Sequence, residues 1–355
     1  MKTKIFLGAY VNFPNAQNIN CDNIAKHLDK EKFEVHAMYT PKMPIDKSVY
    51  KQAGIHLHKL IHHRFIWFWS KLFSMQAANC DIYYLPKSER MDKLFARFHK
   101  RSKKVFLASL EGVVTETTNN STEVKAYFLE EMDDAFAISN CIAQSAEKHW
   151  GVQMPILPLG VAEVSCCAEP KKEISNIIWV GNIKANKRPQ YLLEIAKRFP
   201  QLRFTMIGDG DMTPAMEAQI KEQGIGNVCM TGRIPNDQVY THMQKSDLLL
   251  MTSEFEGLPK VIQEAAQCGV PSIYMAENYT VDFIEDGVNG YAVKSLDEMC
   301  ERLSCLLAEP ERYRALSAKA NEIIQDYTWE RLIPKYEDYF LRMLEKKRQA
   351  DSVGG

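Results

Sequence analysis

One segment of the chain reads Leu248-Leu-Leu-Met-Thr-Ser253-Glu-Phe-Glu256-Gly257-Leu258-Pro259-Lys-Val-Ile-Gln-Glu264-Ala-Ala-Gln-Cys-Gly269-Val-Pro271. Its apolar run predicts a buried strand that ends at Ser253. Pro259 fits the first position of a helix, where its missing N–H costs nothing, and Gly269 is placed to end that helix. A strand, a glycine-containing turn, a helix and a new strand in this order are typical of a parallel α/β sheet.

The turn of this segment has the chemistry of a phosphate site. The predicted turn would place N–H groups around Gly257 and Leu258 at a helix N-terminus, which attracts anions. Glu256 would repel a phosphate and is expected to face hydroxyls, while the two oxygens of Glu264 suit the vicinal hydroxyls of a ribose. Together these groups predict a nucleotide-sugar site. The alternative, a surface helix with two solvated acids, is disfavoured by the strand, turn and helix that surround the acids.

Apolar runs alternate with segments of helical period along the rest of the chain, which is the pattern of βαβ units. Each strand of the second half is followed by a polar or glycine turn, and ligands of open α/β sheets bind at such carboxyl ends. In the first half we expect strands at 5–7, 35–39, 81–85, 105–108 and 135–138, and helices at 18–28 and 88–100. In the second half we expect strands at 177–180, 203–207, 228–230, 248–251 and 272–274, and helices at 189–199 and 213–223.

The pattern breaks near residue 160, where a segment without a clear period includes Pro170. The chain has 355 residues, too many for one core, and its 46% hydrophobic and 25% charged residues are typical of a globular protein. We therefore expect two doubly wound, Rossmann-like α/β domains, residues 1–165 and 171–328. A last helix at about 329–348 contains Pro334, which is expected to kink it, and it is expected to return to the first domain.

A family resemblance is carried by Glu256-Gly-Leu-Pro, continued by Glu264-Ala and Gly269-Val-Pro271. This motif resembles the donor motif of the retaining GT-B glycosyltransferases of family 4, the glycosyl transferases group 1. The resemblance extends from residue 177 to about residue 339 and is much weaker over residues 1–165. It implies the GT-B fold, with two Rossmann-like domains facing a cleft. Further stretches that resemble family motifs are Trp179-Val-Gly-Asn-Ile with Lys187-Arg-Pro, Ile207-Gly-Asp-Gly210, Thr231-Gly-Arg-Ile234, Asp286-Gly-Val-Asn-Gly290 and Tyr327-Thr-Trp-Glu330.

The resemblance implies a role for each residue that matches a family motif. Glu264 would hold the ribose, Glu256 would contact hydroxyls of the donor sugar, and Lys187 would bind the diphosphate. A cation suits that place because the leaving group gains charge as the glycosidic bond breaks. Arg233 and Ile234 would lie against the base. The implied donor site comprises Gly181, Asn182, Lys187, Arg188, Gly208, Arg233, Ile234, Glu256, Gly257, Leu258, Pro259 and Glu264.

Three positions depart from the family pattern. Asn182 stands where the family has an arginine that also grips the diphosphate, and the neighbouring Arg188 could substitute for it. Glu111 stands where the family has a histidine that faces the reaction centre. We interpret Glu111 as a ligand of an acceptor or donor hydroxyl, as a base, or as no more than a turn cap. The family's Gly-Gly loop is also absent, and Asn12 and Asn15 of the loop that replaces it are expected to contact the acceptor.

The resemblance also implies transfer with retention at the anomeric carbon. The departing phosphate oxygen can take the proton of the acceptor, so no dedicated base is required. The expected catalytic residues Glu256, Lys187 and Glu111 would then act by positioning and by stabilising charge.

Neither a cofactor nor a metal is expected. Asp209-Gly-Asp211 matches the Asp-x-Asp pair of metal-dependent transferases, but the start of a helix explains it better. The histidines His56, His58, His62 and His63 have no neighbouring cysteine or acid, and nearby bases disfavour a metal there.

Charge is unevenly distributed along the chain. The net charge is −1, whereas residues 1–165 hold 21 Lys and Arg against 17 Asp and Glu, a net of +4. We interpret one amphipathic helix in this half either as a docking surface for an anionic membrane near a lipid-linked acceptor or as an ordinary solvated helix. It lacks a motif that reads nucleic acid, so that partner is not expected. Its basic stripe is Arg90, Lys93, Arg97 and Arg101, with Met91, Leu94, Phe95 and Phe98 expected on its other side.

The cysteines and apolar runs bear on the compartment. Nine cysteines without a Cys-x-x-Cys pair are typical of free thiols in a reducing compartment. The first apolar run is too short for a signal peptide, and no stretch approaches the roughly 20 apolar residues of a membrane span. We expect a cytoplasmic protein, peripheral at the inner face of the plasma membrane if the basic stripe docks there.

The sequence therefore predicts a metal-independent glycosyltransferase of the hexosyltransferase type. It would use a UDP- or GDP-sugar and a glycan or lipid-linked acceptor, in cell-surface polysaccharide or glycolipid assembly. Two alternatives are a nucleotide-sugar epimerase on the same fold and a non-catalytic nucleotide-sugar binder. The departures at Asn182 and Glu111 allow the binder, while the intact Lys187, Glu256 and Glu264 weigh against it.

Overall fold

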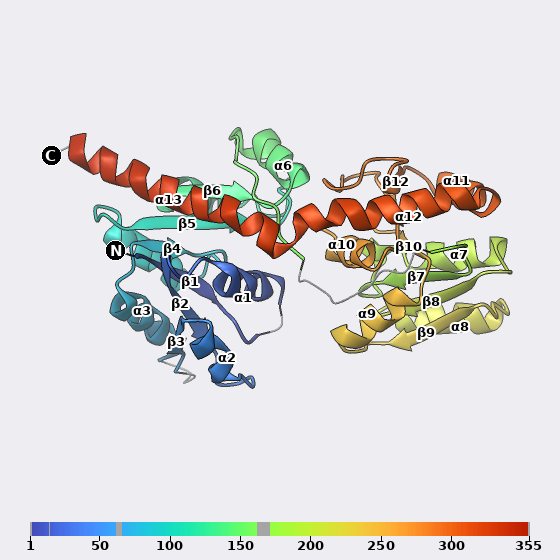
Figure 1. Cartoon of the computed structure of the whole chain (residues 1–355), viewed down its shortest axis with the longest axis horizontal. Coiled ribbons are helices and arrows are strands. Elements are labelled where there is room, and N and C mark those ends of the chain that lie inside the picture. The colour runs from blue at the N-terminus through green and yellow to red at the C-terminus, as the bar shows by residue number, and fades with distance from the viewer. Residues whose placement is uncertain (1, 14, 62–65, 162–170, 354–355) are drawn as a thin grey trace. The chain divides into compact units, whose positions relative to one another are not determined.

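The computed structural model of the chain describes residues 2–13, 15–61, 66–161 and 171–353. It divides into two compact units, each built on a parallel six-stranded sheet with helices packed around it (Figure 1). Unit 1 comprises Met1–Ala162 together with Thr328–Gly355, and unit 2 comprises Glu163–Tyr327.

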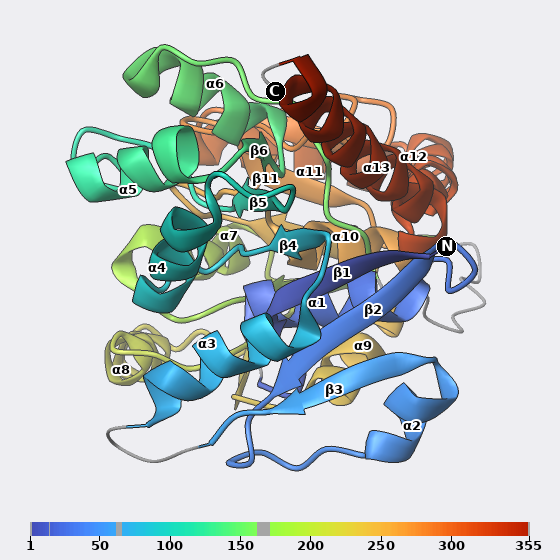
Figure 2. The same ribbon diagram turned by 90° about the vertical axis from the view of Figure 1, so that its left-hand side faces the viewer.

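The sheet of unit 1 has the strand order β3-β2-β1-β4-β5-β6, and these strands can be followed side by side in Figure 2. The chain begins in the middle of the sheet, builds one half and then crosses over to build the other, so the order reverses between β1 and β4. The strands are β1 Thr3–Tyr10, β2 Phe33–Tyr39, β3 Ile55–Lys59, β4 Ile82–Tyr84, β5 Val105–Leu110 and β6 Asp134–Ala137. The helices are α1 Ala16–His27, α2 Lys47–Gln52, α3 Trp67–Ala78, α4 Arg90–His99, α5 Thr122–Ala126, the π-helical turn Tyr127–Glu131 and α6 Asn140–Trp150.

Unit 2 repeats this plan with the order β12-β11-β10-β7-β8-β9, which reverses between β10 and β7. Its strands are β7 Asn176–Val180, β8 Arg203–Ile207, β9 Val228–Gly232, β10 Leu248–Met251, β11 Ser272–Met275 and β12 Gly290–Val293. Its helices are α7 Gln190–Arg198, α8 Thr213–Glu222, α9 Asn236–Gln244, α10 Lys260–Gln267, α11 Leu296–Ala308 and α12 Pro310–Ile324, with the 3-10 turns Ala185–Lys187 and Gln325–Tyr327.

Strand β10 is apolar along its whole length because helices cover both faces of a parallel sheet. Every residue of β10 is buried, and Leu248 and Leu250 join the same core as Ile177 of β7 and Ile273 of β11. The continuous apolar run that predicted this strand therefore reflects burial on both faces.

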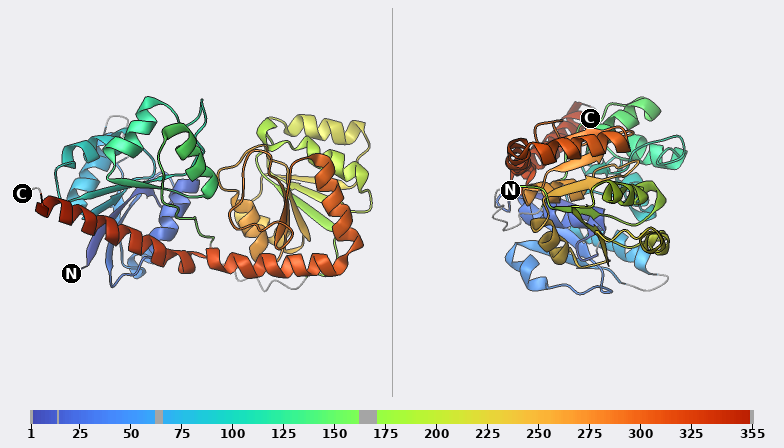
Figure 3. Two further views of the ribbon diagram at one scale, coloured as in Figure 1. Left: turned by 90° about the horizontal axis from the view of Figure 1, so that it is seen from above. Right: turned by 90° about the vertical axis from the view of Figure 1, so that its right-hand side faces the viewer.

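The C-terminal helix α13, Trp329–Val353, belongs to unit 1 and lies along it in Figure 3. The Tyr336 hydroxyl lies 3.2 Å from the Leu157 carbonyl oxygen, and the Tyr339 hydroxyl donates to Asp134 Oδ2 at 3.1 Å. Lys32 Nζ lies 2.8 Å from Glu337 Oε2. These contacts join the two ends of the chain in one folded unit. The helix contains Pro334, and the kink expected there stays a prediction.

Most of the predicted elements are present, with ends that differ by a few residues. The strands expected at 203–207 and 248–251 have the observed bounds of β8 and β10. Helix α10 begins at Lys260, so Pro259 is the residue before the helix and not its first residue. The strands β3 and β12 were not predicted, and no bounds were predicted for the helices α2, α3, α5, α6, α9, α11 and α12. Strand β3, Ile-His-Leu-His-Lys, lies at the edge of its sheet and lacks the apolar run that identified the central strands.

Candidate functional site

The two turns expected to hold a nucleotide-sugar follow neighbouring strands of unit 2. Strands β7 and β10 pair with each other at the point where the strand order reverses. The turn after β7 contains Lys187, and the turn after β10 contains Glu256. Open α/β sheets bind ligands at this reversal, outside the carboxyl ends of the strands. The topology thus brings both turns to the place where this class of sheet takes a ligand.

A chain of hydrogen bonds fixes the two turns to each other. The indole N–H of Trp179, on β7, donates to the Thr252 hydroxyl at 2.9 Å. That hydroxyl donates to the Lys187 carbonyl oxygen at 2.7 Å. The Glu254 N–H also donates to the Asn186 carbonyl oxygen at 2.9 Å. Trp179 and Thr252 are buried, so this clamp of hydrogen bonds keeps the backbone of Lys187 in a fixed position relative to β7 and β10.

The side chains of Lys187 and Glu256 form an ion pair in the structure. Both are half-buried, so the pair is shielded from solvent more than a surface pair would be. Lys187 is therefore held with its ammonium group beside the turn that precedes α10. The two residues expected to act on the diphosphate and on the donor sugar are in direct contact.

The turn after β8 packs closely on the turn after β7, and glycine is what allows it. Gly208 has a φ of 138°, and a Cβ added there would lie 1.8 Å from the Gly181 carbonyl oxygen. The Gly208 N–H donates to the Gly232 carbonyl oxygen at 3.0 Å, which connects the turn after β9 as well. Three consecutive turns of the sheet edge are thus joined through backbone contacts.

Glu264 lies on α10, one helical turn after Lys260. Burial raises the pKa of the Glu264 carboxyl, and Lys260 opposes that rise. Gly257, Leu258 and Pro259 precede the helix and leave its first N–H groups without a side-chain cap. An acid one helical turn into a helix that begins without a side-chain cap is suited to a ligand that carries both hydroxyls and phosphates.

Arg188 lies beside Lys187 but has acidic partners of its own. It has a φ of 46°, and its guanidinium lies 2.7 Å from Glu277 Oε2 and 3.3 Å from Glu254 Oε1. The arginine that could replace the missing cation at Asn182 is thus already paired with two carboxylates. Asn182 itself is exposed.

Arg233 and Ile234 follow β9, and Arg233 is exposed while Ile234 is half-buried. Both therefore lie at the same edge of the sheet as the turns that contain Lys187 and Gly208.

The residues considered as metal ligands have other partners. Asp209 Oδ1 accepts hydrogen bonds from the Gly210 N–H at 2.8 Å and the Thr213 hydroxyl at 3.0 Å, so it caps the turn before α8. His56 and His58 lie on β3, and His62 and His63 fall outside the described residues. Within the described parts of the chain, no group of three or more His, Cys, Asp or Glu residues could hold a metal ion.

Unit 1 has a cavity of about 390 Å³ at its own reversal point, beside the ends of β1, β4 and β5. Glu111 lies in its wall directly after β5. The Ser109 hydroxyl donates to Glu111 Oε1 at 2.9 Å, and the Asn20 amide donates to Glu111 Oε2 at 3.1 Å. The Tyr84 hydroxyl donates a hydrogen bond to the Ser109 hydroxyl oxygen at 2.7 Å. The carboxylate is thus oriented by buried polar groups, which sequence reasoning did not identify.

The two asparagines of the first loop have different surroundings. Asn15 lines the cavity, and its side chain accepts from the Asn18 N–H at 3.0 Å as the cap of α1. The Asn12 amide donates to the carbonyl oxygens of Thr40 and Met43 and accepts from the Thr40 N–H. Asn12 is not among the residues that line the cavity.

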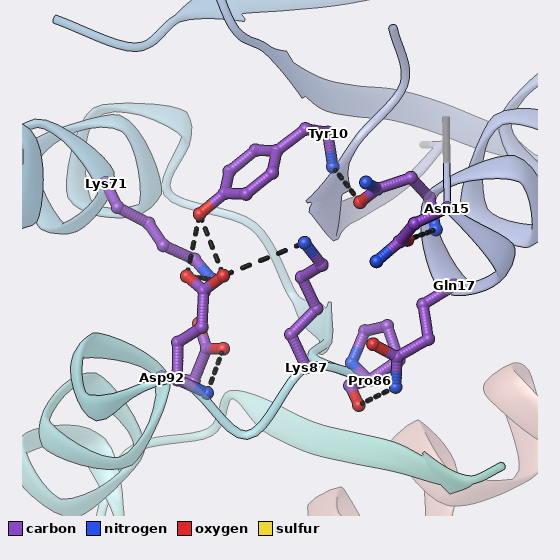
Figure 4. A network of polar contacts seen from close by, with 9 residues as sticks. Tyr10, Asn15, Gln17, Lys71, Pro86, Lys87 and Asp92 are labelled. Carbon is purple, nitrogen blue, oxygen red and sulfur yellow. Dashed lines mark hydrogen bonds and ion pairs between the residues drawn. The ribbon is translucent and has the colours of Figure 1, made fainter. Parts of the chain in front are cut away.

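A buried charge network lies beside this cavity, where Pro86 and Gln17 are in its wall (Figure 4). Lys71 Nζ lies 2.6 Å from Asp92 Oδ1 and 2.8 Å from Glu89 Oε2, and the Tyr10 hydroxyl donates to Glu89. Burial disfavours charge on Lys71, but Asp92 and Glu89 outweigh it and hold the pKa of Lys71 above its usual range. This network could not be predicted from the sequence, because its members come from three separate elements.

Residues 168–323 match the model of the family described as glycosyl transferases group 1. The GDP-mannose-dependent alpha-mannosyltransferase of Corynebacterium glutamicum is 28% identical over 156 residues, which are 43% of this chain and 36% of that protein. The alpha-monoglucosyldiacylglycerol synthase of Acholeplasma laidlawii is 28% identical over 160 residues, 44% of this chain and 40% of that protein. The chain thus spans well under half the length of these curated relatives.

Solved structures extend the likeness to both units at the level of the fold. HepE of Anabaena, solved in complex with UDP, matches with a TM-score of 0.74 at 16% identity, over 96% of this chain and 99% of that one. The predicted architecture of two Rossmann-like domains is confirmed by this match and by the two parallel sheets. Residues 168–323 therefore resemble the glycosyl transferases group 1 family, and the chain has the GT-B fold.

Proposed function

We propose that the chain is a glycosyltransferase that moves a sugar from a nucleotide-sugar to a hydroxyl of a glycan or lipid-linked acceptor. The observation that carries this proposal is the pairing of Lys187 with Glu256 at the reversal point of the family-matched domain. A cation, a hydroxyl-binding acid and the uncapped start of α10 meet there. Relatives named as a mannosyltransferase and a glucosyldiacylglycerol synthase support a sugar nucleotide as the donor.

The Lys187–Glu256 pair gives the donor site a simple mode of action. An incoming diphosphate offers Lys187 a stronger anionic partner than one carboxylate, so the ammonium group turns to the diphosphate. Glu256 is then released to accept hydrogen bonds from hydroxyls of the donor sugar. The pair thus keeps both groups desolvated and oriented before the donor binds, which reduces the reorganisation that binding requires.

The reaction proceeds with retention and without a metal in this proposal. The bond between the anomeric carbon and the diphosphate oxygen breaks, and the acceptor oxygen bonds to the same face of that carbon. The acceptor proton passes to the departing diphosphate oxygen. Lys187 and the N–H groups before α10 stabilise the charge on the leaving group. In this proposal the donor is a UDP- or GDP-sugar.

The cavity of unit 1 is proposed to bind the acceptor. Its wall contains Glu111, Asn15, Gln17, Ser88 and Asn119, which are hydrogen-bonding groups with one carboxylate among them. Such a lining suits the hydroxyls of a sugar. Glu111 is already oriented through Ser109 and Asn20, so it can accept a hydroxyl hydrogen bond without losing side-chain freedom.

A thermal-shift panel of UDP-, GDP- and ADP-sugars tests the donor site. We expect one nucleotide series to raise the unfolding midpoint by about 5 °C at saturating concentration. Glu264→Gln should abolish most of the rise because an NH2 donor replaces one of the two acceptor oxygens offered to the ribose hydroxyls. Burial disfavours the charged form of Glu264, so the amide should fold normally. Glu217→Gln, on an exposed position of α8, is the matched control and should keep the full shift.

The outcomes separate the competing functions. Conversion of the stabilising nucleotide-sugar into another nucleotide-sugar without any acceptor would identify an epimerase. Stabilisation without release of nucleoside diphosphate, whatever acceptor is supplied, would identify a binder. If no nucleotide-sugar shifts the midpoint, the donor site is wrong.

A further inference from the structure

Helices α3 and α4 of unit 1 pack against each other and expose large apolar side chains. Trp69 is 52% exposed, Phe73 is 66% exposed, and Phe98 is 74% exposed. Met91, Leu94, Phe95 and Phe98 were expected on the side of α4 opposite the basic stripe, but Leu94 lines a hollow together with Arg90, Lys93 and Arg97. Met91 and Phe95 are buried, so the apolar stripe of α4 fills the core and leaves Phe98 outside it.

The exposed side chains of α3 form one face. Ile66, immediately before the helix, Trp69 and Phe73 are spaced three and four residues apart, which aligns them along a single side of a helix. Exposed apolar side chains that gather in this way, and do not occur singly, indicate an interaction surface.

Cations border this face. Arg90, Lys93 and Arg97 of α4 line a hollow of about 450 Å³ together with Trp69. The same three residues line an adjoining hollow of about 540 Å³, whose wall also contains the carboxylates Glu123 and Glu131. The hollow beside Trp69 has three bases and no carboxylate in its wall, so it is the one suited to a phosphate group.

The cations are largely available for such a ligand. Arg90 has no hydrogen bond or ion pair with another described residue, and Lys93 lies over the Tyr127 ring at 5.7 Å. Arg97 pairs with Glu131, yet its own side chain is mostly exposed. Arg101, just beyond the helix, is exposed as well.

The two helices also hold their outer face rigidly. Lys71 of α3 and Asp92 of α4 are buried and lie 2.6 Å apart. Breaking such a pair would leave a charge buried and unpaired, which is costly. The buried Lys71–Asp92 ion pair therefore fixes α3 relative to α4, and with them the position of Trp69 relative to Arg90 and Lys93.

We infer that this α3–α4 face, formed by Ile66, Trp69, Phe73 and Phe98 with Arg90, Lys93, Arg97 and Arg101, docks on an anionic phospholipid bilayer. Tryptophan and phenylalanine side chains enter the interfacial layer of a membrane, where amphipathic rings are favoured. Each base near an anionic surface adds attraction, and the hollow beside Trp69 receives a lipid phosphate. No described helix is long and apolar enough to cross a membrane.

A bilayer explains both halves of the surface at once. A nucleic acid would bind the basic side chains and stack on one aromatic ring. It would leave most of the apolar row of α3, formed by Ile66, Trp69 and Phe73, exposed to water. A bilayer accepts the aromatic row in its interface and the basic stripe at its headgroups. The inference is independent of the proposed transfer reaction. It uses neither the residues of the donor site nor Glu111 of the unit 1 cavity.

Vesicle flotation of the full chain tests the inference. Vesicles of phosphatidylcholine with phosphatidylglycerol are compared with pure phosphatidylcholine vesicles at low salt. We expect the protein to float with the anionic vesicles only, and to be released at high salt because screening shortens the range of the attraction. The triple variant Arg90→Gln, Lys93→Gln, Arg101→Gln should bind at least about tenfold more weakly. It spares Arg97, whose pairing with Glu131 supports the fold.

Two controls separate the α3–α4 face from general charge and hydrophobicity. The variant Lys42→Gln, Lys51→Gln, Lys148→Gln removes the same charge from exposed positions elsewhere in unit 1 and should float like the wild type. Trp69→Ser with Phe98→Ser should weaken binding, whereas Val49→Ser, at another exposed apolar position, should not. All variants change exposed or half-buried side chains and should keep the wild-type unfolding midpoint.

Several outcomes would overturn the inference. They are failure of the wild type to float with anionic vesicles at low salt, equal flotation of the Arg90, Lys93 and Arg101 variant, or binding of a single-stranded oligonucleotide that the same variant abolishes while vesicles are not bound.

Discussion

At the scale of single residues, the proposed donor site rests on the ion pair between Lys187 and Glu256 and on the hydrogen bond from Thr252 to the Lys187 carbonyl oxygen. Lys187, Glu256 and Glu264 could be singled out from the sequence, because each lies in a motif with a family resemblance. Their mutual arrangement could not, because the ion pair and the clamp through Thr252 depend on tertiary contacts between distant turns. The same holds for the Ser109 and Asn20 bonds that orient Glu111.

Gly208→Ala tests the close packing of the turns. A Cβ at this position would lie 1.8 Å from the Gly181 carbonyl oxygen, so backbone must shift in a turn that is bonded on both sides. We expect the free energy of unfolding to fall by about 3 kcal/mol or more, in the range of severe backbone substitutions. Urea denaturation measures it. Gly226→Ala, where an added Cβ meets no atom within 4 Å, is the control and should change stability little. Equal stability of both variants would show that the turns do not pack as described.

At the scale of elements, what could be predicted depended on burial. Strand β10 is apolar throughout and β8 is apolar except at Arg203 and Thr205, and the bounds of both followed from the sequence. The edge strand β3 could not be predicted because its alternating histidines gave no apolar run. In the structure these histidines are part of a polar cluster. His36 Nδ1 of β2 lies 2.9 Å from His58 Nε2 of β3, and the His56 ring stacks on His36 at 4.9 Å.

This β2–β3 cluster predicts a dependence of stability on pH. The His36–His58 hydrogen bond needs one neutral acceptor nitrogen, and burial lowers the pKa of His36 and lowers that of His58 to about 4. Since the unfolded histidine pKa is about 6.5, the unfolded chain binds more protons below that pH. The contribution of His58 is therefore full above about pH 6.5 and is lost as the pH falls toward 4.

Thermal midpoints measured between about pH 7 and about pH 4.5 check this prediction. The wild-type midpoint should fall across that span, and His58→Gln, which keeps a polar side chain but cannot titrate, should show a shallower fall. An equal slope for the variant would remove His58 as a cause. Glu34 also faces His36 at 3.1 Å, and Lys4 holds the pKa of Glu34 below its usual range, so a residual loss in the most acidic samples is expected.

At the scale of the whole molecule, the two units show the same plan with different sites. Each sheet reverses its strand order once, and each has its polar residues at that reversal: Lys187 and Glu256 in unit 2, Glu111 and Asn15 in unit 1. Two α/β domains could be predicted from the alternation of apolar runs and helical periods. The cavity of unit 1 could not, because its wall is assembled from loops far apart in the sequence that have no motif in common.

The most direct test of the proposed donor site is a calorimetric titration of the full chain with UDP and with GDP in the presence of EDTA. We expect one of the two to bind at a single site per chain without a divalent metal. Lys187→Gln should weaken that binding by about tenfold or more, since hydrogen bonds to charged groups contribute about 1.5–3 kcal/mol. Lys221→Gln, an exposed lysine of the same unit, should bind like the wild type. Binding of neither nucleotide, or equal binding by Lys187→Gln, would contradict the proposal that unit 2 holds a nucleotide-sugar through Lys187.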